Sequence, residues 1–208
     1  MEIKKTKWED ITISDYKRIC SIKDDDAIDD IGKSVACLAV LCECGEEDIW
    51  NLPMCELGGL IRKIGWTRKF DYKPKKRIPN KVSIAGRKFD VMADLQQMSV
   101  AAYVDYQAYC DDRRGNMGLI LTCFVYPEGS KYAEGYDVRE LATFFEDNVS
   151  IVLWNDISFF LLKNWLNSIR SLQIYLRLTI DRLSQEERTE LERRIREKGL
   201  TLSSIIPS

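Results

Sequence analysis

Acidic side chains that could bind a cation lie close together near the N-terminus, at Asp24, Asp25, Asp26, Asp29 and Asp30. On a helix, Asp25 and Asp29 would lie together at a spacing of four residues, as would Asp26 and Asp30. Carboxylates are Mg²⁺ ligands, but the run lacks the glycine and glutamate positions of an EF-hand loop. We therefore interpret it as an acidic first turn of a helix predicted over Ala27–Glu43.

Four of the seven cysteines gather in one stretch, at Cys37, Cys42, Cys44 and Cys55. Thiolates bind zinc well, but the C-x2-C spacing of a zinc knuckle is absent from this stretch. Cys37 lies in an apolar helical pattern, where a thiol packs as a small buried side chain. The odd cysteine count and the lack of a recognisable secretion signal predict reduced thiols in a cytoplasm.

The chain contains no histidine. This excludes Ser-His-Asp and Cys-His nucleophiles and the metal motifs that contain histidine. Gly129-Ser130-Lys131 is similar to part of a phosphate loop, but the pattern G-x-x-x-x-G-K-[ST] is not present, so we interpret it as a turn. We predict no catalytic residue, no cofactor site and no metal site, and therefore no enzyme.

A basic segment follows the N-terminal helices. Between residues 68 and 88 the chain carries nine basic residues and one acid, Asp71. Pro74 and Pro79 favour an extended backbone, so residues 68–80 are predicted to be a linker. Phe70 and Tyr72 alternate with the cations, a pattern that can bind single-stranded nucleic acid. The alternatives are a solvated connector and a strip that docks on an acidic protein. The nucleic-acid alternative would use Lys73, Lys75, Lys76 and Arg77.

A long apolar repeat begins after residue 150. A helix is predicted from Ser150 to Leu183, and its apolar residues follow the 3-4 spacing of a heptad seam. Such a helix would be roughly 50 Å long, which is longer than the rest of the chain can easily cover. The seam is either core or, in part, a surface for a partner chain. The predicted partner-binding residues are Leu162, Trp165, Ile169, Leu172 and Leu176.

The remaining pattern predicts a mainly α (α+β) protein. Further helices are expected over Asp15–Ile22, Met54–Trp66, Ser99–Cys110, Met117–Tyr126 and Val138–Glu146, with one hairpin over Val82–Val91 that turns at Ala85–Lys88. We predict a helical unit at residues 1–67, the basic linker at 68–80, and an α+β unit at 81–208 that ends in long helices.

Composition narrows the class of partner. With 45% apolar and 31% charged residues, the chain is typical of a globular protein. A net charge of −2 gives no general reason to bind nucleic acid or an acidic membrane. The most apolar windows, Val35–Leu41 and Ile151–Leu162, are too short or too polar to span a bilayer, so no membrane contact is expected.

The order of three motifs resembles that of small assembly proteins of tailed bacteriophages. Trp8–Tyr16 reads W-x-D-I-T-I-x-D-Y, an apolar helix follows over Ser34–Cys42, and Glu46–Pro53 reads E-x-x-I-x-x-L-P. Elements at Ala85–Val91, Tyr103–Gln107 and Tyr126–Asp137 extend the resemblance to about residue 166. The families it resembles are tail-assembly chaperones and virion-associated proteins of crAss-like phages of gut Bacteroidetes.

This resemblance implies a non-enzymatic phage assembly or virion structural protein of the portal and tail region. It would be a tail-assembly chaperone, or else a structural or cargo component. Its partners would be other phage structural and tail proteins, or a second copy of the chain. Its location would be the virion or the bacterial host cytoplasm. The alternative is a phage protein that associates with nucleic acid through residues 68–88.

Overall fold

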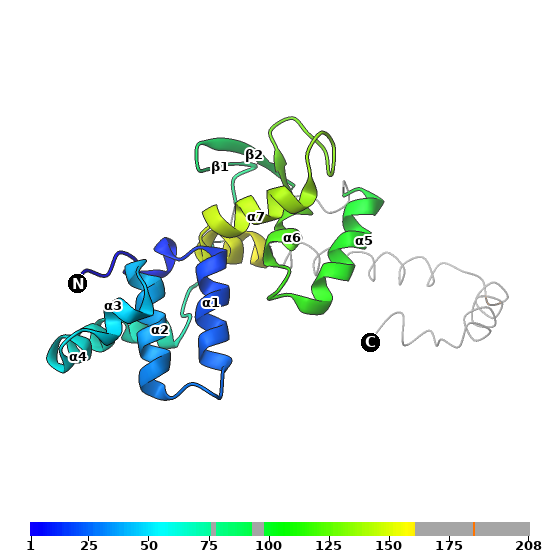
Figure 1. Ribbon diagram of the computed structural model, residues 1–208. Coiled ribbons are helices and arrows are strands. Elements are labelled where there is room, and N and C mark those ends of the chain that lie inside the picture. Colours follow the sequence, from blue (N-terminus) through cyan, green and yellow to red (C-terminus); the bar gives the residue numbers. More distant parts are fainter. Residues whose placement is uncertain (76–77, 93–97, 161–184, 186–208) are drawn as a thin grey trace. The chain divides into compact units, whose positions relative to one another are not determined.

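The structure is a computed structural model that describes residues 1–75, 78–92, 98–160 and 185 of the 208-residue chain. Backbone contacts divide the chain into two compact units, Met1–Phe160 and Leu161–Ser208. The first unit is mainly helical with a small antiparallel sheet, which confirms the predicted fold class (Figure 1). The second unit lies almost wholly outside the described residues.

The chain begins with a group of short helices. Two 3-10 turns, η1 (Trp8–Asp10) and η2 (Gly65–Arg68), flank four helices: α1 (Ile13–Asp24), α2 (Asp30–Cys42), α3 (Glu46–Trp50) and α4 (Met54–Lys63). The Thr12 hydroxyl and the Asp15 carboxylate cap α1 reciprocally, and Asp29 caps α2. Helix α1 therefore begins at Ile13, earlier than the predicted Asp15. Asp29 and Asp30 supply the cap and first turn of α2, which begins at Asp30 and not at the predicted Ala27, whereas Asp24 and Asp25 end α1.

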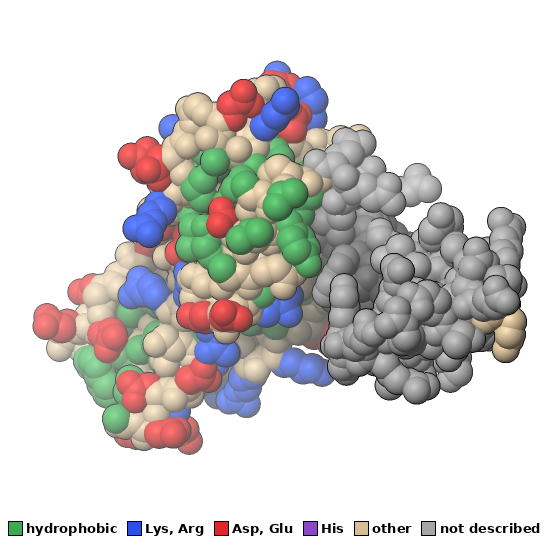
Figure 2. Space-filling model, turned by 90° about the vertical axis from the view of Figure 1, so that its right-hand side faces the viewer, with side chains coloured by type: hydrophobic (Ala, Val, Ile, Leu, Met, Phe, Trp, Pro, Cys, Tyr) green, Lys and Arg blue, Asp and Glu red, His purple; other side chains and the backbone are tan. Residues whose placement is uncertain are grey.

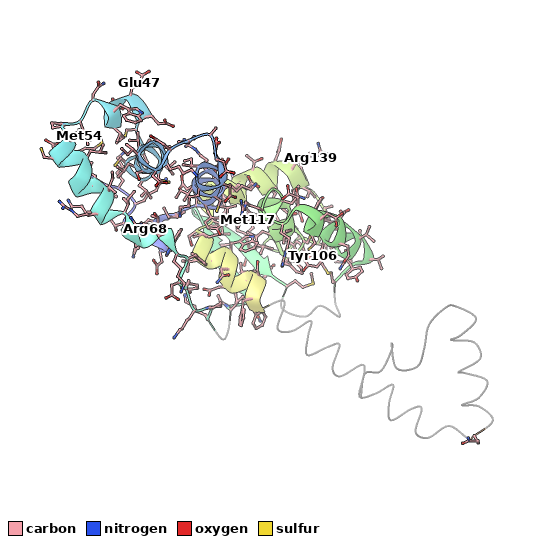
Figure 3. All side chains as sticks on the ribbon, turned by 90° about the horizontal axis from the view of Figure 1, so that it is seen from below. Glu47, Met54, Arg68, Tyr106, Met117 and Arg139 are labelled. Atoms are coloured by element: carbon pink, nitrogen blue, oxygen red, sulfur yellow. The ribbon has the colours of Figure 1, made fainter. Side chains whose placement is uncertain are left out.

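Helix α2 lies at the centre of this group. Every residue from Val35 to Cys42 is buried, and α2 contacts α1, α3 and α4. Figure 3 shows α1 and α2 nearly end-on and side by side, with α4 running from Met54 towards Arg68. A helix with neighbours on several sides needs an apolar surface nearly all round, which explains the unbroken apolar run.

The predicted hairpin is formed by β1 (Lys81–Ile84) and β2 (Arg87–Val91). Ile84 pairs with Arg87, so the turn is Ala85-Gly86 and is shorter than the predicted Ala85–Lys88. Both turn residues have positive φ, 45° and 77°. Positive φ at both central positions is what the tight type I′ turn requires.

A third strand, β3 (Val125–Pro127), pairs with β2 and gives the order β1-β2-β3. The prediction of one helix over Met117–Tyr126 was therefore wrong at its end. Helix α6 covers only Met117–Thr122, after which the chain turns into the sheet. An apolar run has the same appearance in a buried helix and a buried strand, and the edge of β2 provides the pairing partner.

Three further elements complete the unit. They are α5 (Val100–Tyr109), the 3-10 turn η4 (Cys110–Asp112) and α7 (Val138–Asn148), and residues 151–160 are also helical. Helix α7 packs on α6 and on α1. The Ile13 N–H donates to the Val149 carbonyl at 3.0 Å, and the Ile151 N–H donates to the Ile11 carbonyl at 2.8 Å. Residues 11–13, near the start of this unit, are thus hydrogen-bonded to residues 149–151, near its end.

The predicted division of the chain into two units joined by a linker at residues 68–80 stays a prediction.

Two glycines should respond to alanine in opposite directions. A Cβ at Gly118 of α6 would lie 2.5 Å from the Ala142 carbonyl oxygen of α7, so Gly118→Ala must push these helices apart. We expect a loss of about 1–3 kcal/mol in the free energy of unfolding. Gly58 of α4 has no neighbouring atom within 4 Å of the added Cβ.

Gly58→Ala should therefore raise the free energy of unfolding by about 0.5–1 kcal/mol, because alanine restricts the unfolded chain and favours the helix. Urea denaturation of both variants measures the two effects. Changes of the same sign at Gly118 and Gly58 would contradict the close packing of α6 on α7.

Candidate protein-binding surface

The predicted heptad seam, comprising Leu162, Trp165, Ile169, Leu172 and Leu176, lies outside the described residues. The described part of this helical pattern ends at Phe160. The partner-binding role of the seam stays a prediction.

The basic segment is attached to the helix at residues 151–160 through one carboxylate. Asp156 is 3% exposed, and the Tyr72 hydroxyl donates to its Oδ1 and Oδ2 at 3.0 and 3.1 Å. The Lys75 backbone N–H donates to Oδ1 at 2.8 Å. The Lys75 and Lys73 side chains are exposed, whereas Lys76 and Arg77 lie outside the described residues. Residues 72–75 are therefore held in place by hydrogen bonds.

The aromatic rings of the segment are also engaged. The Phe70 ring lies edge-on to Trp8 at 4.9 Å between centroids, and Trp8 meets Trp66 at 5.0 Å. Phe70 also contacts Tyr72 at 6.1 Å. Desolvation and the hydrogen bond to Asp156 raise the pKa of the Tyr72 hydroxyl above its ordinary value. Phe70 and Tyr72 therefore pack within the protein, and do not stand free as stacking platforms for bases.

Asp156 was missed as a site residue by sequence reasoning. The sequence places it in the apolar window Ile151–Leu162, which carries the two polar residues Asn155 and Asp156. Two features of the sequence could have indicated its role. Asp156 is an acid in a mostly apolar helical pattern, and the chain has one dense basic segment that could supply its partners. A buried carboxylate needs donors, and the basic segment supplies them through a backbone N–H and a hydroxyl.

The acidic run is used for local structure. The Asp24 carboxylate pairs with the Arg114 guanidinium. Asp25 accepts from the Ala27 N–H at 2.9 Å, and Asp29 accepts from the Gly32 N–H at 2.7 Å. Within the described ranges, no group of three Asp, Glu, Cys or His side chains is arranged to hold a metal ion.

The clustered cysteines are free thiols in the structure. Cys37 and Cys42 are buried in α2, and Cys55 is exposed. Burial raises the pKa of the Cys37 thiol and of the Cys42 thiol. These two side chains are therefore protonated at neutral pH and pack as apolar groups.

Helix α5 has one side packed within the protein and an apolar strip on another side that is exposed. Its inner face carries Ala102, which is fully buried, and Tyr106, whose ring packs on Phe124 at 5.1 Å. Its outer face exposes Val100 (80%), Val104 (57%) and Tyr103 (48%). Figure 2 shows hydrophobic side chains gathered on the side of the unit that α5 occupies. The helix predicted over Ser99–Cys110 is confirmed as α5, Val100–Tyr109.

The outer face of α5 has the chemistry of a protein interface. The three exposed side chains are at i, i+3 and i+4, so they form one continuous strip. The single charged residue of α5, Asp105, accepts a hydrogen bond from the Tyr132 hydroxyl at 2.5 Å and is not on this strip. Interface cores are depleted in charge and enriched in tyrosine, which is the character of this strip.

No protein-family model matches this chain, and no curated protein or solved structure matches it. Across the described ranges, the structure contains no helix with both the length and the apolar character needed to cross a membrane. Val100, Tyr103 and Val104 define the exposed strip of α5.

Proposed function

We propose that this protein is a non-enzymatic bacteriophage assembly protein that binds other structural proteins of the portal and tail region. The observation that carries the proposal is the exposed apolar strip of α5. Burying a large apolar side chain contributes about 1.5–3 kcal/mol, so three such side chains supply substantial binding free energy. The resemblance of Trp8–Trp66 to phage assembly proteins supports the class of partner.

The partner surface that fits this strip is an apolar helix face of another phage structural protein. The strip lies on the surface of a single helix and carries no charge. A partner would therefore bind it through complementary shape and apolar contact more than through opposite charge. Both a tail-assembly chaperone and a structural or cargo component would use such a contact.

The arrangement of the aromatic side chains gives less support to the nucleic-acid alternative. Stacking on bases needs free aromatic faces next to cations. Phe70 and Tyr72 instead contact Trp8 and Asp156 within the protein.

The test is pairwise co-expression with each portal and tail protein of the source phage, followed by size-exclusion chromatography. Val104→Glu should weaken the complex about a hundredfold, because it places a charge in a desolvated apolar contact. Met54→Glu is the matched control, since Met54 is 75% exposed and lies on α4, away from the strip (Figure 3). The double change Ile169→Glu and Leu176→Glu tests the predicted seam in the same assay.

Loss of the complex in Val104→Glu, with Met54→Glu unaffected, would support the α5 strip. Loss only in the double variant would place partner binding on the seam. If no portal or tail protein co-elutes with the wild type, and the protein is missing from purified virions and from infected-cell complexes, the proposed function is wrong.

A further inference from the structure

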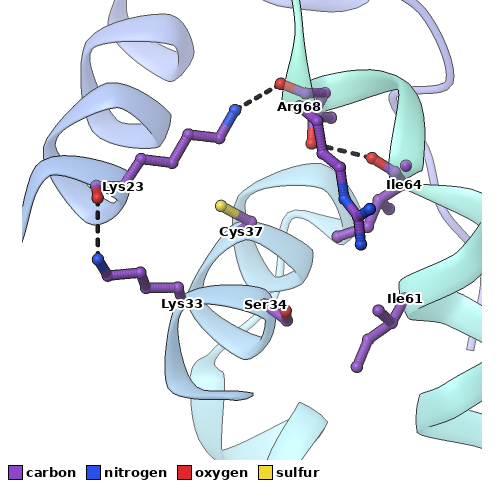
Figure 4. A pocket seen from close by; sticks show the side chains of 9 residues that line it. Lys23, Lys33, Ser34, Cys37, Ile61, Ile64 and Arg68 are labelled. Carbon is purple, nitrogen blue, oxygen red and sulfur yellow. Dashed lines mark hydrogen bonds between the residues drawn. The ribbon is translucent and has the colours of Figure 1, made fainter. Parts of the chain in front are cut away.

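A cavity of about 100 Å³ lies between α1, α2, α4 and η2. Three cationic side chains line it, Lys23 from the last turn of α1, Lys33 from the first turns of α2, and Arg68 from η2. Its apolar side is formed by Cys37, Ile61 and Ile64. Figure 4 shows the Lys23 and Arg68 side chains on opposite sides of the opening, with the Cys37 sulfur pointing into it.

The two lysines are held in place by backbone carbonyls. The Lys33 ammonium donates to the Lys23 carbonyl at 2.9 Å, and the Lys23 ammonium donates to the Thr67 carbonyl. An ammonium has three donors, so each lysine has two left for a ligand. These bonds order the two long side chains before a ligand arrives, which reduces the entropy lost on binding.

The three positive charges are not neutralised by the protein. Among the residues that the structure describes, no carboxylate forms an ion pair with Lys23, Lys33 or Arg68, and none lines the cavity. The nearby Asp24 instead pairs with Arg114. Cations grouped around one cavity repel one another unless an anion is bound there.

The nucleophilic side chains that line the cavity are not activated. The Ser34 and Thr67 hydroxyls donate to the backbone carbonyls of Asp30 and Ile64. Burial raises the pKa of the Cys37 thiol, and this outweighs the opposite effect of the Lys23 charge. The thiol is therefore protonated at neutral pH, and a protonated thiol is a poor nucleophile. The arrangement is suited to binding a ligand, not to converting one.

We propose that this cavity binds a phosphate group, carried either by inorganic phosphate or by a phosphate monoester. A phosphate group carries a charge of about −1.5 to −2 near neutral pH and has several acceptor oxygens, so it matches three cations better than one carboxylate does. Lysine and arginine are the common protein ligands of phosphate. Ile61 and Ile64 offer an apolar contact for the uncharged part of a monoester. The inference is independent of the α5 strip.

The decisive experiment titrates inorganic phosphate into the full chain at constant ionic strength and follows binding by ³¹P NMR and the melting temperature. Arg68→Gln should weaken binding about tenfold, because it removes a charge-assisted hydrogen-bond donor. Arg62→Gln is the matched control: it makes the same change in net charge, and Arg62 is exposed on α4 and does not line the cavity. Lys33→Gln is a second test variant.

Saturable binding that falls in Arg68→Gln and Lys33→Gln but not in Arg62→Gln would confirm the site. Repeating the titration with phosphoserine and with adenosine monophosphate identifies the source, since tighter binding of the monoesters would show that the apolar side takes part. An equal response to phosphate and chloride in the wild type would overturn the proposal. So would equal phosphate affinity in Arg68→Gln and Arg62→Gln.

Discussion

Replacing Asp156 with alanine is expected to lower the free energy of unfolding by about 3 kcal/mol, because two donors lose the charged, buried acceptor that they share. The Asp156 carboxylate accepts from the Tyr72 hydroxyl at 3.0 Å and from the Lys75 N–H at 2.8 Å. These bonds join residues 72–75 to the helix at 151–160, so their loss also releases the segment. Urea denaturation measures the change.

Asp147→Ala is the matched control for Asp156→Ala. Asp147 is an exposed residue of α7, so its removal should change the free energy of unfolding by less than about 0.5 kcal/mol. Tyr72→Phe should give an intermediate loss of about 1 kcal/mol, because it deletes one hydrogen bond and leaves the ring in place. Equal stabilities of the Asp156→Ala and Asp147→Ala proteins would show that the carboxylate does not hold the basic segment.

Phe145→Ala should lower the free energy of unfolding by about 3–5 kcal/mol, since it opens a cavity in the core between α7 and the sheet. Phe145 is completely buried, and its ring packs on Phe89 of β2 with centroids 5.2 Å apart. Thermal and urea unfolding of the variant give the loss.

Phe159→Ala provides the comparison for Phe145→Ala, because it removes the same ring from a site that is 45% exposed. Its effect should be about 1 kcal/mol or less, since the transfer term is roughly halved and little cavity forms. A Phe145→Ala protein as stable as Phe159→Ala would mean that the sheet does not depend on α7 for its packing.

Local signals in the sequence were reliable for helix positions. Helices were predicted over Ser99–Cys110 and Val138–Glu146, and α5 and α7 lie there, with the Ser99 and Asp137 side chains accepting from their first-turn N–H groups. Capping depends on residues three positions apart, so it can be recognised without knowledge of the fold. The end of α2 shows the limit. This helix was predicted to include Glu43, but it ends at Cys42. Glu43 is the C-cap and has a left-handed backbone at φ 54°, and Gly45 is the N-cap of α3.

Long-range pairing was not accessible in the same way. Val125 and Tyr126 were predicted to end a helix because their apolar pattern suits a helix as well as a strand, and only the edge of β2 decides between them. The hydrogen bonds of Asp156 with Tyr72 and Lys75 span more than eighty positions of sequence. No local pattern reports a contact over that separation.

From its sequence alone this protein was determined to be mainly helical, with a hairpin over Val82–Val91 and no histidine for chemistry. Those features depend on composition and on neighbouring residues. The tertiary structure decided which apolar surfaces are covered, because burial is a property of what packs on a face and not of the face itself. It left Val100 and Val104 of α5 in solvent, and it placed Lys23, Lys33 and Arg68 from three separate segments around one cavity.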